Sequence, residues 1–307
     1  MSLYIGSLER IFRDAEIAAR SNEAVLILGE TGVGKEVLAR YIHEHSRRRN
    51  KPFLPINCAA IPAHLLESEL FGHEKGAFTG ATQRRKGLLE QAQGGTVFLD
   101  EVVEMPPEAQ AKLLRTIETK ELRPLGGSRY RLIDVRFIAA TNSDIKLKVD
   151  RGEFRRDLYY RLSIFVYSIP PLRQRLQDIP ALIKYFIAED GVGARISATA
   201  LELLMCYPWP GNVRELKNVI AQALARSEGG DIQVAHLPEH IVARCHQRDV
   251  LMGTDLRRKT ACFEAHLLAE MMRQYPDPEE AARRLGLGLR TLYRKLKKYG
   301  ISYRRSS

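Results

Sequence analysis

The chain has 307 residues, 45% hydrophobic and 28% charged, a composition typical of globular proteins and a length that favours two or more domains. No apolar run approaches the roughly 18 residues of a membrane span, and the N-terminus lacks the basic-then-apolar pattern of a secretory signal. The four cysteines are scattered without a C-x-x-C pair, which argues against a disulfide framework or a zinc site. We therefore expect a cytoplasmic protein with no membrane partner.

The net charge of +11 is concentrated at the C-terminal end. Residues 257–307 contain 13 Lys/Arg and 5 Asp/Glu, a net charge of +8, so the preceding part of the chain is nearly neutral. A small basic module behind a near-neutral body is typical of proteins that bind nucleic acid.

An amphipathic stretch within residues 1–24 precedes an apolar strand at 25–28. The strand is followed by Gly29-Glu30-Thr31-Gly32-Val33-Gly34-Lys35, and a helical pattern covers 34–46. Strand, glycine turn and helix in this order are typical of a phosphate-binding loop, in which backbone N–H groups and the helix N-terminus surround the phosphates and Lys35 neutralises them. Glu36 stands where Ser or Thr usually reaches Mg²⁺, so the metal must depend on other groups and water. The alternative is a glycine turn that only connects strand to helix.

A strand near 53–57 and a helix after Pro62 lead to the apolar strand 96–100, which ends in Asp100-Glu101. A buried parallel strand delivers its last residues to the carboxyl edge of the sheet, where ligands bind. Asp100 is placed to hold Mg²⁺ through water, and Glu101 to orient and deprotonate the attacking water. An acid pair after a strand could instead cap a helix, but together with the glycine turn it predicts hydrolysis of a nucleoside triphosphate.

Strands and helices continue to alternate as far as Pro171. The pattern predicts a helix beginning near Pro106, a hairpin over 121–133, a strand at 135–141, a helix over 153–160 and a strand at 164–169. This alternation predicts an α/β fold with a parallel sheet between helices. From 172 the strands stop, and helices over 178–189, 197–206 and 212–227, with Asp178 and Ser197 as N-caps, predict a small all-α domain.

Three helical patterns occupy the last 48 residues. The first has Phe263, Leu267 and Met271 on one stripe, which fits either dimer packing or an ordinary core face. The second begins at Asp277, an N-cap followed by proline, and stops at Gly286. The third turns basic side chains outward, so the pair predicts a helix-turn-helix whose last helix lies in the DNA major groove, unless this is merely a solvated charged face. The candidate DNA contacts are Arg290, Thr291 and Arg294 at base edges, and Lys297 and Lys298 at phosphates.

Between the two halves of the phosphate site lies a Gly-rich loop with one aromatic and one hydroxyl side chain at its tip. Its run Gly76-Ala77-Phe78-Thr79-Gly80-Ala81 resembles the signature of bacterial enhancer-binding proteins, the AAA+ activators of sigma-54 RNA polymerase. The resemblance extends over nearly the whole chain, including the segments 69–74, 154–162, 170–173 and 209–216. The terminal module is similar to the Fis-type domain of the same family, and Glu36 also fits the family pattern.

The resemblance implies an AAA+ nucleotide-binding domain at 1–170, an α-helical lid at 171–242, a linker at 243–258 and a Fis-type helix-turn-helix domain at 259–307. It implies ATP and Mg²⁺ as cofactors. The implied partners are sigma-54 RNA polymerase holoenzyme, enhancer DNA and further copies of the chain, as a dimer on DNA and a hexameric ring when active. Family members often carry an N-terminal sensory domain, for which this sequence has no room. We therefore expect either control by another protein or a longer parent chain.

The resemblance also implies roles for matching residues of the loop and the nucleotide site. Phe78 and Thr79 would contact sigma-54. Asn57 would hold Glu101 in a nucleotide-sensing switch, and Thr141 with Asn142 would sense the γ-phosphate.

Three arginines have implied roles as well. Arg155 and Arg161 resemble arginine fingers that reach the ATP of a neighbouring subunit, a contribution worth roughly 10³–10⁵ in rate where it has been measured. Both lie near Asp157 in sequence and could instead form ordinary surface ion pairs of little energetic weight. Arg214, in the predicted lid, resembles the second sensor arginine.

Two other classes of function remain open at the sequence level. A sigma-54-independent regulator would use ATP only to assemble on DNA, and would not need the 76–81 loop. A remodelling ATPase acting on a different protein would use the terminal module as a protein-binding bundle. Binding by such a bundle would not weaken steeply with rising salt, as DNA binding does.

Overall fold

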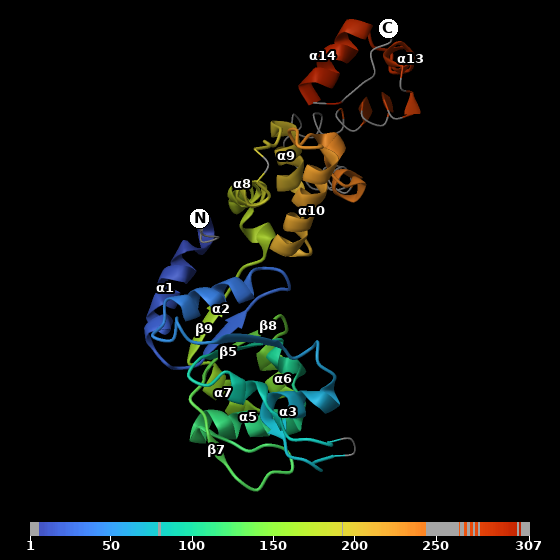
Figure 1. The fold of residues 1–307 in the computed structure, drawn as a ribbon. Helices are drawn as coiled ribbons and strands as arrows, with labels where there is room; N and C mark the ends of the chain where they lie inside the picture. The colour runs from blue at the N-terminus through green and yellow to red at the C-terminus, as the bar shows by residue number, and fades with distance from the viewer. Residues whose placement is uncertain are drawn as a thin grey trace. The chain divides into compact units, whose positions relative to one another are not determined.

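The computed structural model describes residues 6–78, 81–191, 193–243 and 277–299, together with 264, 267, 268, 271, 272, 274, 275 and 301. The chain divides into two compact units between Pro171 and Leu172. Each unit is described below by itself (Figure 1).

The first unit is built on a five-stranded parallel sheet with the strand order β2-β5-β8-β1-β9. Its strands are β1 (Val25–Leu28), β2 (Phe53–Asn57), β5 (Thr96–Asp100), β8 (Arg136–Thr141) and β9 (Phe165–Ser168). The central strands β5 and β8 are buried almost throughout because helices cover both of their faces. The predicted α/β fold is thus confirmed.

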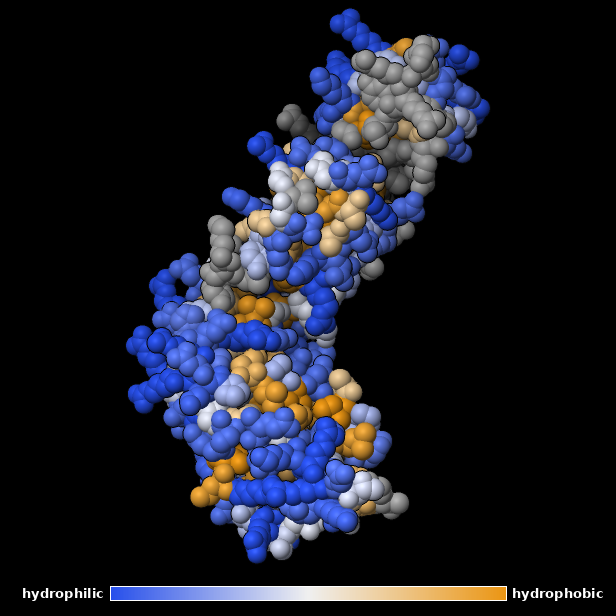
Figure 2. Space-filling model, viewed as in Figure 1, coloured by the Kyte–Doolittle hydropathy of each residue, from blue (hydrophilic) through white to orange (hydrophobic). Residues whose placement is uncertain are grey.

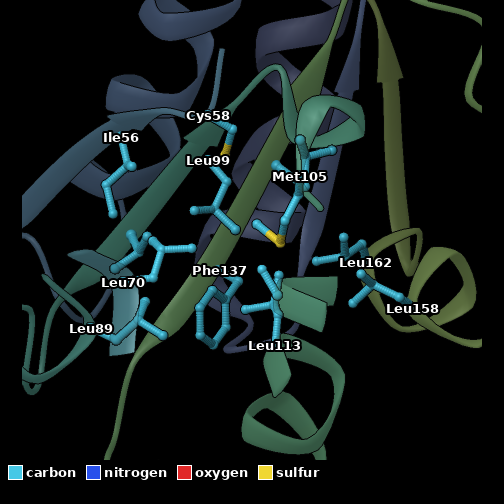
Figure 3. Close-up of a cluster of buried hydrophobic side chains, with 14 of the residues drawn as sticks. Ile56, Cys58, Leu70, Leu89, Leu99, Met105, Leu113, Phe137, Leu158 and Leu162 are labelled. Carbon is cyan, nitrogen blue, oxygen red and sulfur yellow. The ribbon is translucent and has the colours of Figure 1, made fainter. Parts of the chain in front are cut away.

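Helices lie on both sides of this sheet (Figure 1). One side carries α1 (Glu9–Arg20) and α2 (Lys35–Glu44), and the other carries α3 (Ala63–Phe71), α5 (Pro107–Thr119), α6 (Ile145–Asp150) and α7 (Arg156–Leu162). The second side holds a large core in which Leu70, Leu99, Leu113 and Phe137 are fully or almost fully buried (Figure 3). Each such side chain contributes roughly 1.5–3 kcal/mol through burial, so this core fixes the sheet that supports the site.

Two short antiparallel pairs stand outside the main sheet. The strands β6 (Glu121–Leu122) and β7 (Arg131–Leu132) form the predicted hairpin, and β3 (Gly72–His73) pairs with β4 (Arg85–Lys86), just before the short helix α4 (Leu88–Gln91). The β3–β4 pair was not expected, because two-residue strands leave no periodic pattern. It converts the predicted Gly-rich loop into an arm, defined here as residues 72–86.

The segment after β8 also differs from expectation. The helix predicted over 153–160 begins at Arg156 and ends at Leu162, and α6 (Ile145–Asp150) was not predicted at all. Helix α6 has only six residues, too few for a clear apolar period, but its N-cap is readable: Asp144 accepts hydrogen bonds from the N–H groups of Lys146 and Leu147.

The second unit begins with α8 (Ile179–Glu189), α9 (Ala198–Cys206) and α10 (Asn212–Arg226), close to the predicted helices. Trp209 is fully buried in their core. Ser197 caps α9 as predicted, accepting from the N–H of Ala200. The N-cap role predicted for Asp178 is wrong, because this residue has helical dihedral angles and makes no capping bond. It is 3% exposed, and its carboxylate lies 3.8 Å from the buried Arg175 guanidinium.

The terminal module contains α13 (Pro278–Arg284) and α14 (Leu289–Tyr299), and Asp277 caps α13 as predicted. Leu268 and Met272, beside the predicted stripe, are buried with Leu292 and Leu296 of α14, whereas Leu267 of the stripe is 38% exposed and Met271 is half-buried. Phe263 and the linker residues 244–258 lie outside the described residues.

The face drawn in Figure 2 is mostly hydrophilic, with apolar side chains in small separate groups. Within the described ranges, no helix combines the length and the apolarity that a membrane crossing requires.

Candidate nucleotide-binding site

The glycine turn connects β1 to the first turn of α2. Gly32 and Gly34 have φ values of +79° and +109°, in the left-handed region that favours glycine, and Gly34 is the N-cap of α2. This backbone path turns the loop around the helix N-terminus, whose free N–H groups and partial positive charge suit a phosphate.

Lys35 lies at the centre of the site with only 7% of its surface exposed. Its ammonium group donates to the carbonyl of Gly29 at 2.9 Å and lies 3.4 Å from Oε1 of Glu101. The lysine therefore joins the glycine turn to the acid pair at the end of β5.

Glu101 is fixed from two sides. Besides the contact with Lys35, its Oε2 accepts the N–H of Asn142 at 2.9 Å. Its φ of +51° is unusual for a residue other than glycine and is typical of strained functional positions. The carboxylate is therefore held in one place at the carboxyl edge of the sheet.

Asp100 is the residue before Glu101, and its Oδ1 accepts the N–H of Glu101 at 3.1 Å. Burial raises the pKa of Asp100, and the nearby charge of Glu101 adds to that rise, while Lys35 opposes it. A partly buried carboxylate next to a phosphate-binding turn is a hard oxygen donor that fits Mg²⁺. The neighbouring Glu36 is engaged elsewhere, because Arg40 binds its Oε1 through Nε at 3.1 Å and Nη2 at 2.8 Å.

Asn142, which directly follows β8, contacts both the glycine turn and the acid pair. Its side-chain Nδ2 donates to Oγ1 of Thr31 in the glycine turn at 2.8 Å, while its backbone N–H binds Glu101. The preceding residue, Thr141, is buried, and its carbonyl accepts the N–H of Gly29 at 3.2 Å. The structure thus brings together the glycine turn, the acid pair and the residues at 141–142, as the sequence predicted.

Asn57 differs from expectation. It ends β2 opposite Asp100, but its Oδ1 accepts the N–H groups of Ala59 and Ala60, at 2.9 and 3.2 Å. Within the described part of the chain, no hydrogen bond joins Asn57 to Glu101. These bonds turn the amide oxygen of Asn57 toward the loop after β2, and the contact with Glu101 that the resemblance implied is absent from this structure.

The two candidate finger arginines lie at either end of α7, and both bind carboxylates of their own chain. Arg155 donates through Nε and Nη2 to Asp157, at 3.1 and 2.7 Å, and this contact raises the pKa of Arg155 and lowers that of Asp157. Arg161 donates through Nε to Glu118 at 3.1 Å. The surface ion pairs that the sequence left open are therefore present, and they occupy both arginines in this state.

The arm carries the other candidate contacts. Phe78 lies at its tip and is 42% exposed, whereas Thr79 lies outside the described residues. Near the tip, the N–H of Ala81 donates to the carbonyl of Phe78 at 3.0 Å and the N–H of Gly76 to the carbonyl of Ala81 at 2.8 Å.

Sequence reasoning missed the residue that fastens the base of the arm. Arg131 of the β6–β7 hairpin binds Glu74 through Nη2 and Glu90 through Nη1, both at 2.7 Å. Backbone bonds accompany it: Glu74 donates to the carbonyl of Leu125 at 3.0 Å, and Leu125 to that of Gly72 at 2.9 Å. The charged residues were visible in the sequence, but nothing in their spacing indicated that the hairpin and the arm meet.

The candidate residues of the second unit are on accessible surfaces. Arg214 is exposed in the first turn of α10. In α14, Arg290, Arg294, Lys297 and Lys298 are exposed and Thr291 is half-buried. Lys298 also donates to the Tyr299 hydroxyl at 3.0 Å, which partly ties it to its own module.

Three successive segments of the chain match models of known protein families. Residues 4–168 match the sigma-54 interaction domain, 173–251 the AAA+ ATPase lid domain, and 263–299 the bacterial regulatory protein family named after Fis. The first match alone covers more than half of the chain. The chain belongs to the sigma-54-dependent activator family.

Named relatives support this membership. The chain is 43% identical over 303 residues to the nitrogen fixation protein AnfA of Azotobacter vinelandii, covering 97% of this chain and 57% of that protein. It is 44% identical over 317 residues to the regulatory protein LuxO of Vibrio cholerae, covering 95% of this chain and 60% of that protein. The chain thus spans about half the length of the curated sigma-54 activator relatives it matches.

A solved structure supports the fold as well. The chain is similar to NtrX from Brucella abortus in complex with ADP, with a TM-score of 0.72 and 31% identity, covering 97% of this chain and 70% of that one. The parallel sheet and its helices therefore form an AAA+ P-loop fold. The helices that follow are the AAA+ lid, and the terminal helix-turn-helix is a Fis-type domain.

Proposed function

We propose that this chain hydrolyses ATP and uses the hydrolysis to activate transcription by sigma-54 RNA polymerase. The observation that carries the proposal is the convergence of Lys35, Glu101 and Asn142 at the carboxyl edge of a sheet whose neighbouring arm bears Phe78. Family membership supports the reading of this arrangement as an ATPase site. We propose the following domains: nucleotide-binding domain 1–170, lid 171–242, linker 243–258 and helix-turn-helix domain 259–307.

The chemistry follows from the roles that these side chains can fill. The glycine turn and Lys35 bind the phosphates, and Glu101, held by Asn142, takes the proton of the attacking water. Asp100 would hold Mg²⁺, which, when bound, stabilises the charge that develops on the phosphate oxygens. Asn142 contacts both Glu101 and Thr31 of the glycine turn, so it is placed to respond when a γ-phosphate binds.

The arm is linked to the acid pair through continuous structure. Helix α5 begins six residues after Glu101 and leads directly into the β6–β7 hairpin, which Arg131 fastens to the base of the arm. We infer that a change around Glu101 on ATP binding moves the hairpin and raises the arm, so that Phe78 and Thr79 engage sigma-54, and that hydrolysis lowers it again.

Assembly and DNA binding complete the proposal. Arg155 and Arg161 would leave their own carboxylates to reach the ATP of a neighbouring copy in a hexameric ring, and Arg214 would sense ATP from the lid. A dimer of the terminal module would dock on enhancer DNA through Arg290, Thr291, Arg294, Lys297 and Lys298, which raises the local concentration of the activator near a looped promoter.

The test separates the arm from the ATPase site. Thr79→Ala should leave ATP hydrolysis within about twofold of wild type and abolish formation of open promoter complexes by sigma-54 RNA polymerase. Open complexes can be counted by permanganate reactivity of the melted promoter. If activation survives replacement of both Phe78 and Thr79, the assignment of the arm is wrong. If the wild-type chain never hydrolyses ATP under conditions that permit oligomers, the whole proposal fails.

A further inference from the structure

The ring of Phe78 packs against the ring of His73 on the same arm. The two ring centroids are 5.0 Å apart and the planes meet at 68°, an edge-to-face arrangement that aromatic pairs favour. Since Phe78 is still 42% exposed, His73 contacts part of the ring and leaves the rest available to a partner.

The ring of His73 is itself oriented by a neighbour. Its Nδ1 lies 2.8 Å from the hydroxyl oxygen of Ser68, and which of the two donates depends on the imidazole tautomer. Ser68 belongs to α3 and is buried. The histidine therefore connects the exposed tip of the arm to a packed helix of the first unit.

The backbone of His73 is held on both sides. It pairs with Arg85 across the β3–β4 ladder and forms a bridge with Leu125 of the hairpin segment. Hydrogen bonds from Leu125 to Gly72 and from Glu74 to Leu125 flank the bridge. The imidazole thus projects from a fixed part of the arm, while Phe78 lies in the turn at its end.

We propose that His73 is a positioning residue for the sigma-54 contact: its ring, oriented by Ser68, holds Phe78 in the orientation in which it meets its partner. The inference rests on the proposed function, because it takes Phe78 to be the sigma-54 contact. A side chain whose rotamers are already restricted loses less freedom on binding. Loss of one edge-to-face pair should therefore weaken binding of sigma-54 about two- to tenfold.

The first experiment measures the affinity of the full chain for sigma-54 in the presence of a non-hydrolysable ATP analogue. His73→Ala should bind about two- to tenfold more weakly than wild type. His73→Phe, which keeps an aromatic ring, should bind nearly as well as wild type, and Ser68→Ala should fall between the two. His64→Ala, which removes an exposed histidine from the same helix as Ser68, should have no effect.

ATP hydrolysis and the thermal midpoint should not change in any of these variants, which separates positioning from a general loss of structure. Two results overturn the inference. One is equal weakening by His73→Phe and His73→Ala, since the ring would then be irrelevant. The other is tighter binding by His73→Ala, since His73 would then restrain Phe78 from its partner.

The second experiment needs no sigma-54. Hydroxyl-radical labelling of the full chain, read by mass spectrometry, should oxidise the Phe78 side chain faster in His73→Ala than in wild type or His64→Ala. Unchanged labelling together with unchanged sigma-54 affinity overturns the inference alone. Failure of the wild-type chain to bind sigma-54 at all overturns the proposed function, and the inference with it.

Discussion

Glu101 shows how a single residue combines strain with fixed contacts. Its left-handed backbone would cost on the order of 1–3 kcal/mol in isolation. The surrounding structure offsets this because Oε1 lies 3.4 Å from the Lys35 ammonium and Oε2 accepts the N–H of Asn142 at 2.9 Å. A carboxylate held in this way can take a proton from one defined water position.

We expect Glu101→Gln to retain ATP binding and to lose hydrolysis by about 10²–10⁴-fold, because glutamine keeps the shape of the side chain but accepts no proton. Binding of a fluorescent ATP analogue and steady-state phosphate release measure the two properties. Glu104→Gln, an exposed neighbour, is the matched control and should hydrolyse ATP at the wild-type rate. Normal turnover in Glu101→Gln would remove Glu101 from the mechanism.

His43 is a buried titratable residue of α2, eight residues after Lys35. Its Nδ1 lies 3.0 Å from the hydroxyl oxygen of Thr96, and burial lowers its pKa from the ordinary value of 6.5. The folded chain therefore takes up this proton less readily than the unfolded chain. The free energy of unfolding should fall as pH drops below 6.5 toward the lower pKa of the folded state, and this loss is absent at higher pH.

The corresponding variant is His43→Gln, which removes the titrating group but keeps a polar side chain near Thr96. Its free energy of unfolding, from urea titrations at about pH 7.5 and 5.5, should depend less on pH than that of wild type. His64→Gln, an exposed histidine, should keep the wild-type slope. An unchanged slope in His43→Gln would mean that other groups set the acid limit of stability.

At the scale of elements, the β6–β7 hairpin follows α5, which begins six residues after Glu101, and Arg131 binds it to the arm. The two 2.7 Å ion pairs of Arg131 use both ends of its planar guanidinium, a geometry that lysine cannot reproduce. The pairs are partly exposed, so each contributes only modestly to global stability. Their effect should be local, on the order of the arm.

We therefore expect Arg131→Gln to speed backbone hydrogen exchange at Glu74 and Leu125 while ATP hydrolysis stays near the wild-type rate. Arg131→Lys should fall between wild type and Arg131→Gln, because it can keep one of the two ion pairs. Arg129→Gln removes the same charge from the same hairpin at an exposed position and should change neither property. Equal exchange in Arg131→Gln and Arg129→Gln would show that the ion pairs do not hold the arm.

The strands β1, β5 and β8 could be predicted because each contains a continuous apolar run with polar or turn residues at its ends. The glycine turn and the acid pair could be placed together because parallel strands bring their carboxyl ends to one edge. Missed elements such as α4, α6 and the β3–β4 pair are too short to show a period. Contacts between distant side chains, such as Arg131 with Glu74, depend on tertiary packing that local sequence does not encode.

Asp178 and Asn57 illustrate the other kind of error. Asp178 has the residue type and position of an N-cap, but burial beside Arg175 determines its role instead. Asn57 was assigned to Glu101 by the family resemblance rather than by a local pattern, and in the structure its amide oxygen accepts the N–H groups of Ala59 and Ala60. For Asp178, the local pattern was correct about polarity and wrong about the partner.

At the scale of the whole molecule, the proposed ring requires each finger to act on a neighbour's ATP. Arg161→Ala removes the finger but keeps Glu101, and Glu101→Gln removes the general base but keeps Arg161. Each variant alone should therefore be nearly inactive. Mixing the two inactive variants should restore part of the hydrolysis, because some interfaces then combine an intact Arg161 with an intact Glu101. Phosphate release at increasing ratios measures the recovery, and its absence at every ratio would argue against a finger supplied in trans.

DNA binding by the complete chain should depend steeply on salt. Lys297→Ala with Lys298→Ala should weaken binding uniformly across sequences and reduce the slope of log affinity against log salt by up to about two, because each phosphate contact contributes close to one unit. Lys298 forms a bond within its own module, so its share should be the smaller. Fluorescence anisotropy at several salt concentrations measures the slope, and an unchanged slope would exclude phosphate contacts by these lysines.

The ion pairs on α7 also bear on a solitary copy of the chain. Arg155 lies 2.7 Å from Asp157, Arg156 lies 3.9 Å from Asp150, and Arg161 lies 3.1 Å from Glu118. Each of the three positive charges is therefore paired with a carboxylate of the same chain. Unrelated acidic proteins in a crowded cell would therefore find little net attraction on this surface. Each of these exposed pairs is worth at most about 1 kcal/mol, so a partner that presents several anionic groups at once, such as a bound triphosphate, can replace the carboxylates at small cost.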